Sequence, residues 1–324
     1  MKRFLSIFLL VAVIVTVFVG CGASAEDESK LSVVCTVFPQ YDFVRNIAKD
    51  KADVKMLVPL GTESHDFQLE NLTVSELKTV AKADLVIYVG GESDLDWITE
   101  LKNTIRGNAS WMAMTDMVET LEEISSDSME HIHDHTADHD EHHDHEGHTA
   151  YDEHVWTSPK RVIVVVEAIT DELCRLDPDN SEFYRQNCED YIKELQRLDS
   201  ELSKTCKNGL KSKLIFGDRF PFRYLCEDYG LEFDAAFSGC SSGVDPSVAQ
   251  MTSLTRNAIE SGVRVVFYME NSDPVFAESI AKTVKGKAEL LHSCHTFSKT
   301  EITNGVSYIS VMRENIIKIA EALK

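Results

Sequence analysis

The stretch Asp84-Leu-Val-Ile-Tyr-Val-Gly-Gly91 shows the pattern that decides the fold of this chain. Its apolar residues run without the alternation of a strand that has one face in solvent, and two glycines end the run. Short runs of this kind recur along the chain, and most are followed by a segment with helical spacing. Buried strands that alternate with helices predict parallel sheets covered on both faces. The expected strands are residues 31–38, 54–60, 84–89, 213–216, 231–237, 264–268 and 288–291.

A long amphipathic helix separates the first three expected strands from the last four. It begins at Ser158-Pro159, a capping residue followed by a proline, and Asp177-Pro178 ends it. We therefore predict an α/β fold with two lobes, each containing a parallel sheet, joined by this helix, and a ligand site in the cleft between the lobes. The expected boundaries are 31–157 for the first lobe, 158–178 for the linker helix and 179–324 for the second lobe.

The N-terminal segment has the features of an export signal followed by a tether. Lys2 and Arg3 precede an apolar stretch, and Phe18-Val-Gly-Cys21 resembles a bacterial lipobox. The resemblance implies that residues 1–20 are a signal peptide and that a lipid on Cys21 anchors the exported protein to the outer face of the cell membrane. Residues 21–30 are small and acidic, which indicates a tether. No later stretch is long and apolar enough to span a bilayer.

The chain is strongly acidic, with a formal net charge of -22 over 324 residues. Such a charge repels phosphate backbones, which argues against nucleic acid as a partner, and it concentrates cations. Residues 127–150 hold eight histidines among acidic residues, which is a metal-binding composition with too few apolar residues to fold alone. We interpret this segment as a loop that captures metal ions weakly. The alternative is a solvated acidic insertion without a metal role.

Histidines and carboxylates follow several of the expected strands, at the edge where open α/β sheets bind ligands. The candidates at this edge are His65, Asp218, Glu270, His292 and His295, and His154, just ahead of the long helix, is a further candidate. Imidazoles together with a carboxylate suit Zn²⁺. The ligand set that we adopt is His65, His154, Asp218 and His292. Four protein ligands leave no open position for a reactive water, which suits a carrier rather than a hydrolase.

Four features together resemble the zinc and manganese receptor lipoproteins of bacterial ABC importers. They are the lipobox, the segment Gly61-Thr-Glu-Ser-His-Asp66, the acidic His-rich loop, and Asp152-x-His154-x-Trp156 leading into Ser158-Pro159. The resemblance covers nearly all of the mature chain, and the elements occur in the same order. It implies that His65 and His154 match the family's first two histidine ligands. The family's fourth ligand falls near His292.

The third ligand of the family does not carry over directly. It is a His or Glu that precedes an aromatic segment, and that segment ends here at Tyr229-Gly-Leu231. Simple spacing places Arg219 at the ligand position, and arginine cannot bind a cation. A shift of one residue supplies Asp218 instead. The alternatives are His295 and Glu270.

The resemblance implies both an architecture and a function. The architecture is two α/β lobes bridged by one rigid helix, with the metal between the lobes. The function is that of an extracytoplasmic receptor that binds zinc with high affinity and delivers Zn²⁺ to the membrane permease of an ABC importer. The long His-rich loop is similar to that of the zinc members, so Mn²⁺ is the less favoured cargo. We expect a monomer without enzymatic activity.

Two other functions remain to be distinguished. One is a surface zinc store or adhesin, in which residues 127–150 are the functional part. The other is an exported metalloenzyme, which the sequence disfavours because it contains no His-Glu-x-x-His, no Gly-x-Ser-x-Gly and no Gly-rich phosphate loop.

Two cysteines of the second lobe are candidates for a disulfide. Cys240 and Cys294 each follow an expected strand, and export makes a bond between them possible. Free thiols or a direct contact with metal are the alternatives. Seven cysteines remain after Cys21, and this odd number argues against a complete disulfide framework.

Overall fold

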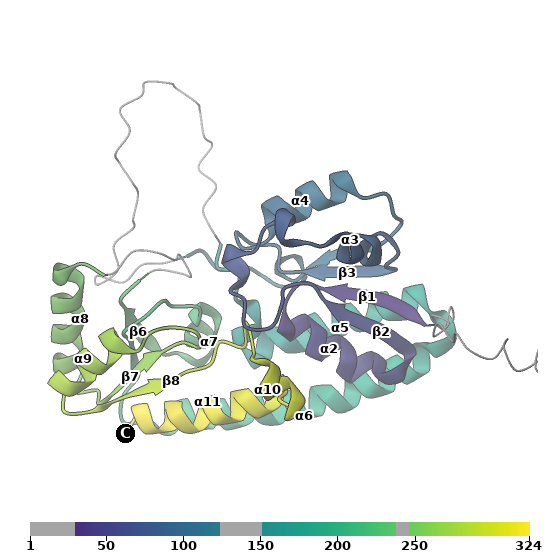
Figure 1. The fold of residues 1–324 in the computed structure, drawn as a ribbon. Helices are drawn as coiled ribbons and strands as arrows, with labels where there is room; N and C mark the ends of the chain where they lie inside the picture. The colour runs from purple at the N-terminus through teal and green to yellow at the C-terminus, as the bar shows by residue number, and fades with distance from the viewer. Residues whose placement is uncertain (1–29, 124–150, 238–245) are drawn as a thin grey trace, which may run out of the picture. The chain divides into compact units, whose positions relative to one another are not determined.

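The computed structural model describes residues 30–123, 151–237 and 246–324. In these residues the chain forms two four-stranded parallel sheets with helices packed against them (Figure 1). The strand orders are β2-β1-β3-β4 and β6-β5-β7-β8, so the second lobe repeats the topology of the first. The prediction of two α/β lobes with parallel sheets is confirmed.

The first lobe is built on the apolar runs that the sequence predicts as strands. Its strands are β1 (Leu31–Cys35), β2 (Ala52–Met56), β3 (Leu85–Tyr88) and β4 (Ser110–Ala113), and its helices are α2 (Phe38–Ala48), α3 (Val74–Ala81) and α4 (Leu95–Thr104). Every residue of β3 is buried, as its uninterrupted apolar run predicts. The sequence patterns do not predict β4, because this edge strand is short, half-exposed and without β-branched residues.

The second lobe follows the same plan. Its strands are β5 (Lys213–Phe216), β6 (Glu232–Ala235), β7 (Val265–Tyr268) and β8 (Lys287–Leu290). Its helices are α7 (Arg223–Tyr229), α8 (Val248–Glu260), α9 (Val275–Thr283), α10 (Lys299–Thr303) and α11 (Tyr308–Ala322). No helix in the described part of the chain has the length and apolar character needed to cross a membrane.

Two long helices lie between the sheets in the sequence. The first, α5 (Pro159–Leu176), begins at the expected proline, and the second is α6 (Ser181–Asn208). Five aliphatic side chains of α5 are fully buried, and each contributes about 1.5–3 kcal/mol by leaving water: Val162, Val165, Val166, Ile169 and Leu173. Helix α6 contacts α5, α2 of the first lobe and α11 of the second (Figure 1). This helix therefore ties the two lobes together.

Aromatic side chains extend the hydrophobic core across the boundary between the lobes. The ring centroids of Phe38 and Phe297 lie 4.2 Å apart, and Phe43 meets Tyr308 edge-on with 5.2 Å between centroids. The backbone N–H of Tyr308 also donates to Asp42 Oδ2 at 3.1 Å. One buried hydrophobic cluster accordingly contains residues of both lobes. The loops at the carboxyl ends of the two sheets are thus held against each other by a packed core.

Candidate metal centre

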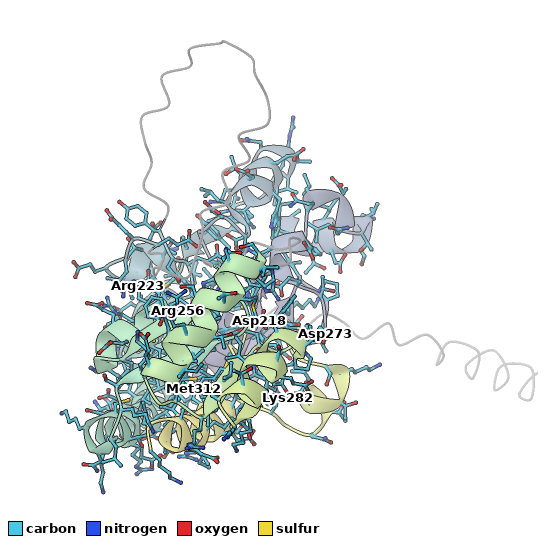
Figure 2. The ribbon with its side chains drawn as sticks, turned by 90° about the vertical axis from the view of Figure 1, so that its left-hand side faces the viewer. Asp218, Arg223, Arg256, Asp273, Lys282 and Met312 are labelled. Atoms are coloured by element: carbon cyan, nitrogen blue, oxygen red, sulfur yellow. The ribbon has the colours of Figure 1, made fainter. Side chains whose placement is uncertain are left out.

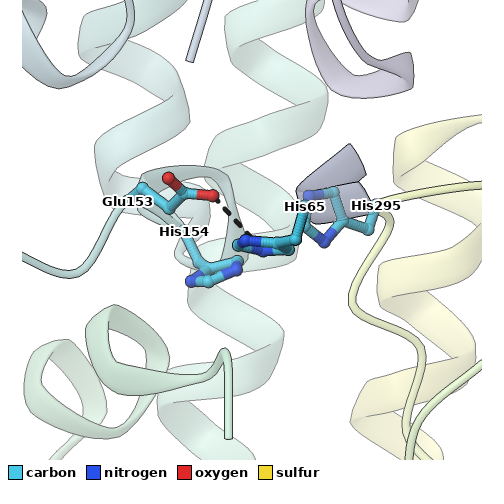
Figure 3. A group of neighbouring side chains, drawn as sticks. All are labelled: His65, Glu153, His154 and His295. Carbon is cyan, nitrogen blue, oxygen red and sulfur yellow. Dashed lines mark ion pairs between the residues drawn. The ribbon is translucent and has the colours of Figure 1, made fainter. Parts of the chain in front are cut away.

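Four side chains converge between the lobes: His65, Glu153, His154 and His295 (Figure 3). Each offers one potential ligand atom, and these atoms all lie within 4.8 Å of one another. His65 comes from the loop after β2, Glu153 and His154 from the segment before α5, and His295 from the loop after β8. Three imidazoles and a carboxylate are a typical donor set for Zn²⁺.

The loop after β2 brings His65 to the site. His65 is the middle residue of the short 3₁₀ helix η2 (Ser64–Asp66). Earlier in the same loop, Gly61 has a φ of 79°, which only glycine adopts without strain, and its N–H donates to Thr296 Oγ1 of the second lobe at 3.0 Å. The Nε2 atom of His65 lies 3.4 Å from Glu153 Oε1 (Figure 3).

A carboxylate fixes the orientation of His154. Asp152 Oδ1 accepts a hydrogen bond from the backbone N–H of His154 at 2.8 Å and lies 3.1 Å from its Nδ1. A ligand histidine whose Nδ1–H points to a carboxylate presents the lone pair of Nε2 to the metal. Asp152 is in turn held by Tyr224, whose hydroxyl donates to its backbone carbonyl at 2.7 Å.

The loop after β8 places His295, rather than His292, beside the other two imidazoles. Cys294 has a φ of 64°, and this left-handed residue turns the chain between the two histidines. His295 Nε2 lies 2.5 Å from Ser64 Oγ, and its ring centroid is 5.3 Å from those of both His65 and His154. Glu270 Oε1 supports the loop by accepting the N–H of His295 at 3.2 Å.

Burial favours the neutral forms of several side chains at this site. It lowers the pKa of His65 to about 3, and the charges of His154 and Arg219 act in the same direction. Burial likewise lowers the pKa of His295 well below its ordinary value. The same desolvation raises the pKa of Glu153 and of Glu63. The imidazoles of His65 and His295 are therefore neutral near pH 7, as metal ligands must be, and a bound cation would relieve the cost of ionising the buried carboxyls.

Several polar atoms at this site have no hydrogen-bond partner. They are Glu63 Oε1, His65 Nε2, Glu153 Oε1 and His295 Nδ1, and all four are buried. A buried polar atom without a partner costs about 1–3 kcal/mol. Donor atoms of this kind, gathered in one place, fit a metal ion that would satisfy them together.

Asp218 and His292 lie outside this group. Asp218, labelled in Figure 2, belongs to the second lobe. Its Oδ1 accepts the N–H of Arg219 at 2.8 Å, and its Oδ2 accepts the N–H of Met269 at 2.9 Å. The ring of His292 stacks on Phe297, with 4.5 Å between centroids. Its Nδ1 accepts the N–H of Cys294 at 2.9 Å. Thus the structure brings together His65 and His154 of the expected set, but not Asp218 and His292.

His295 is only an alternative ligand in the sequence prediction, and Glu153 is absent from that prediction. Both residues lie close to a histidine that the sequence analysis favours as a ligand. Glu153 precedes His154 directly, and His295 shares a loop with His292. The proximity of Glu153 to the expected ligand His154 was the available signal. Glu270, the other alternative, accepts hydrogen bonds from the backbone N–H and the hydroxyl of Ser293 at 2.8 and 2.6 Å.

The chain matches a family model described as zinc-uptake complex component A, periplasmic, over residues 33–322. It is 31% identical to the high-affinity zinc uptake system protein ZnuA of Bacillus subtilis over 329 residues, which cover 99% of this chain and 98% of that protein. It is 30% identical to the zinc-binding lipoprotein AdcA of Streptococcus pneumoniae, covering 96% of this chain but only 59% of AdcA.

A solved structure with the same fold is that of the metal-dependent lipoprotein YcdH of Bacillus subtilis. It superposes with a TM-score of 0.74 at 30% sequence identity, over 91% of this chain and all of the other. The match of the family model over nearly the whole chain, the identity to ZnuA and the shared fold all indicate the same family. The chain belongs to the family of zinc-uptake complex component A, the periplasmic ZnuA family.

Proposed function

We propose that this protein is an extracytoplasmic receptor that binds one Zn²⁺ between its lobes and delivers the ion to the permease of an ABC importer. The observation that carries the proposal is the group of three imidazoles and one carboxylate with their donor atoms within 4.8 Å of one another. Family membership supports the transport role, because the related ZnuA is named for zinc uptake. The protein acts as a carrier and not as an enzyme.

The ligands in this proposal are His65, His154, His295 and Glu153. This set replaces Asp218 and His292 of the sequence prediction. The replacement rests on hydrogen bonding: both carboxylate oxygens of Asp218 accept backbone N–H groups. The donor atoms of the proposed set include buried atoms without partners. A metal ion is the partner that such a set can share.

Zinc is favoured over manganese by the donor atoms. Three imidazole nitrogens suit Zn²⁺, whereas Mn²⁺ prefers sites dominated by carboxylates, carbonyls and water. The related AdcA is named a zinc-binding lipoprotein, which supports the same choice. We propose that residues 127–150, which lie outside the described residues, raise the local concentration of Zn²⁺ near the cleft.

The protein is proposed to be anchored by a lipid on Cys21 after removal of residues 1–20, with residues 21–30 as a tether and a monomeric domain beyond it. These residues also lie outside the described part, apart from Lys30. Support comes from the lipobox resemblance and from relatives that are named lipoproteins. A Cys21→Ser variant should leave the membrane fraction of cells and appear in soluble form. If it stays with the membrane, the anchor is elsewhere.

Native mass spectrometry of the mature chain tests the zinc proposal. One tightly held Zn²⁺ is expected, both in the parent and in a variant without residues 127–150, and excess Mn²⁺ should not displace it. Retention of the ion after the deletion assigns it to the cleft. Loss of all metal on deletion would instead support a zinc store that depends on the His-rich loop.

A further inference from the structure

Arg219 places a positive charge at the edge of the proposed metal site. It follows β5 of the second lobe, and its Nη2 lies 3.5 Å from Glu63 Oε2 of the first lobe. The same nitrogen lies 3.4 Å from Ser272 Oγ. The side chains of Arg219 and Glu63 are only 13% and 15% exposed. This ion pair therefore crosses between the lobes in a site largely shielded from solvent.

Glu63 faces both Arg219 and the metal ligands. While Oε2 contacts the guanidinium, Oε1 lies 3.8 Å from His295 Nδ1. Both Oε1 and that Nδ1 are buried and without hydrogen-bond partners. Glu63 also lies two residues before His65 in the same loop. A small rotation of its carboxylate would exchange the contact with Arg219 for one with an ion held by the histidines.

The charge of Arg219 acts on the same groups that a metal would use. Its guanidinium contacts one carboxylate oxygen of Glu63, and the other carboxylate oxygen lies beside the imidazole of His295. A guanidinium remains charged at every pH that proteins experience. It therefore attracts the carboxylate of Glu63, which lies 3.5 Å away, whenever no metal is bound.

We propose that Arg219 competes with the metal for Glu63 and thereby limits zinc affinity, so that the ion can leave the site when it is delivered. Arg219 is in this view a positioning residue, because it touches Glu63 and not the ion. The inference rests on the proposed function and deepens it. It concerns how strongly the site holds zinc rather than whether it does so.

Zinc affinity and the zinc dissociation rate of full mature variants test this role. Arg219→Met keeps a side chain of similar length without the charge, and it should bind zinc about tenfold tighter and release it correspondingly more slowly. Arg219→Lys restores the charge and should return both values to within about threefold of the parent. Arg175→Met is the matched control, since Arg175 is 61% exposed and pairs with Glu172 of the same helix, α5. It should leave zinc binding unchanged.

A double-mutant cycle with Glu63→Gln separates competition from simple charge repulsion. If Arg219 acts through Glu63, Arg219→Met should change zinc affinity by less than about threefold in the Glu63→Gln background. An undiminished tenfold gain there would show that the charge alone acts and would overturn the proposal. Unchanged or weaker zinc binding by folded Arg219→Met would overturn it as well.

The proposed function fails in a different way from this inference. If the parent holds no zinc, the receptor proposal is wrong, whatever Arg219 does. In that event the same double-mutant cycle still measures the ion pair between Glu63 and Arg219, provided that the free energy of unfolding of each metal-free variant is measured instead of zinc affinity. A favourable coupling between Glu63 and Arg219 is expected without metal, and its absence would overturn the inference.

Discussion

Trp156 of the first lobe donates a hydrogen bond from its indole Nε1 to the backbone carbonyl of Ser293 in the second lobe, at 2.8 Å. Trp156 lies two residues after His154, and Ser293 lies two residues before His295. The bond therefore links the two segments that carry proposed ligands from opposite lobes. The Trp156 carbonyl is held as well, because Tyr308 donates its hydroxyl to it at 2.7 Å. The distance between His154 and His295 is fixed by this buried linkage.

Replacing Trp156 by phenylalanine should weaken zinc binding without removing a ligand. The change leaves the Ser293 carbonyl without a partner, which costs about 1–3 kcal/mol of unfolding free energy. It also frees the loop that carries His295, and lost support of this kind lowers metal affinity by about 10–100-fold. Calorimetry and urea unfolding measure the two effects.

Tyr184→Phe is the control for this substitution. It also removes one hydrogen bond, a partly buried one in which the Tyr184 hydroxyl donates to Asp177 Oδ2 at 2.6 Å, between the end of α5 and the start of α6. It should lower stability and leave zinc affinity as it is. Equal zinc affinities for Trp156→Phe and the parent would show that the linkage does not set the geometry of the site.

The ligand assignment predicts a contrast between two histidines of one loop. His295→Ala should lose roughly 100-fold or more in zinc affinity, because four-ligand zinc sites are worth about 10–16 kcal/mol in total. His292→Ala and Asp218→Asn should each lose less zinc affinity than His295→Ala, since their polar atoms are used in hydrogen bonds within the second lobe and neither variant removes a proposed ligand. Isothermal titration with a competing chelator measures all three. The reverse order would reinstate Asp218 and His292 as ligands.

The architecture could be predicted from the sequence because strands of a buried parallel sheet consist of continuous runs of apolar residues. The run at β3 is fully buried, whereas the edge strand β4 lacked that signal. The helix α5 was marked at both ends, by Ser158-Pro159 and Asp177-Pro178. Signals of this kind depend only on neighbouring residues, so they can be recognised in the sequence before the fold is known.

The candidate metal site could be predicted from the sequence only in part. His65 and His154 were chosen from their own motifs, and both lie in the group of four side chains. The choice between His292 and His295 depends on the left-handed conformation of Cys294 and on the meeting of the two lobes, and no local pattern encodes these. The possible bond of Cys294 to Cys240 stays a prediction, since Cys240 lies outside the described residues.

Asp94 predicts how stability depends on pH. Its carboxylate is buried and accepts the N–H groups of Val89 and Gly90 at 2.6 and 2.9 Å, and burial raises its pKa to about 7. Because the folded pKa lies above the ordinary value near 4, the folded state holds this proton more tightly than the unfolded state does. The stability that it contributes is complete below about pH 4 and is lost as the pH rises to about 7, at up to about 1.4 kcal/mol per pH unit.

Asp94→Asn removes this titration. The difference in unfolding free energy between parent and variant, from urea titrations at several pH values, should change between pH 4 and pH 7 and be constant above that range. A difference that is independent of pH throughout would mean that Asp94 ionises in the folded protein as it does in the unfolded chain.

The last prediction concerns the carboxylate behind His154. Asp152→Asn keeps the shape of the side chain but removes the charge that lies 3.1 Å from His154 Nδ1. The imidazole then donates its electron pair to the metal less strongly. Its tautomer is also no longer fixed, because the amide of the asparagine can face Nδ1 with either its oxygen or its nitrogen. Zinc affinity should fall by about 10–100-fold while the four proposed ligands remain.

The control is Asp84→Asn, which removes one charge at the start of β3, where Asp84 Oδ2 accepts the N–H of Ser32 at 2.8 Å. Asp84 lies at the amino ends of the strands, away from the loops that carry the site, so this control should bind zinc as the parent does. If both variants bind equally well, the carboxylate of Asp152 holds the backbone of the segment and does not tune the metal ligand.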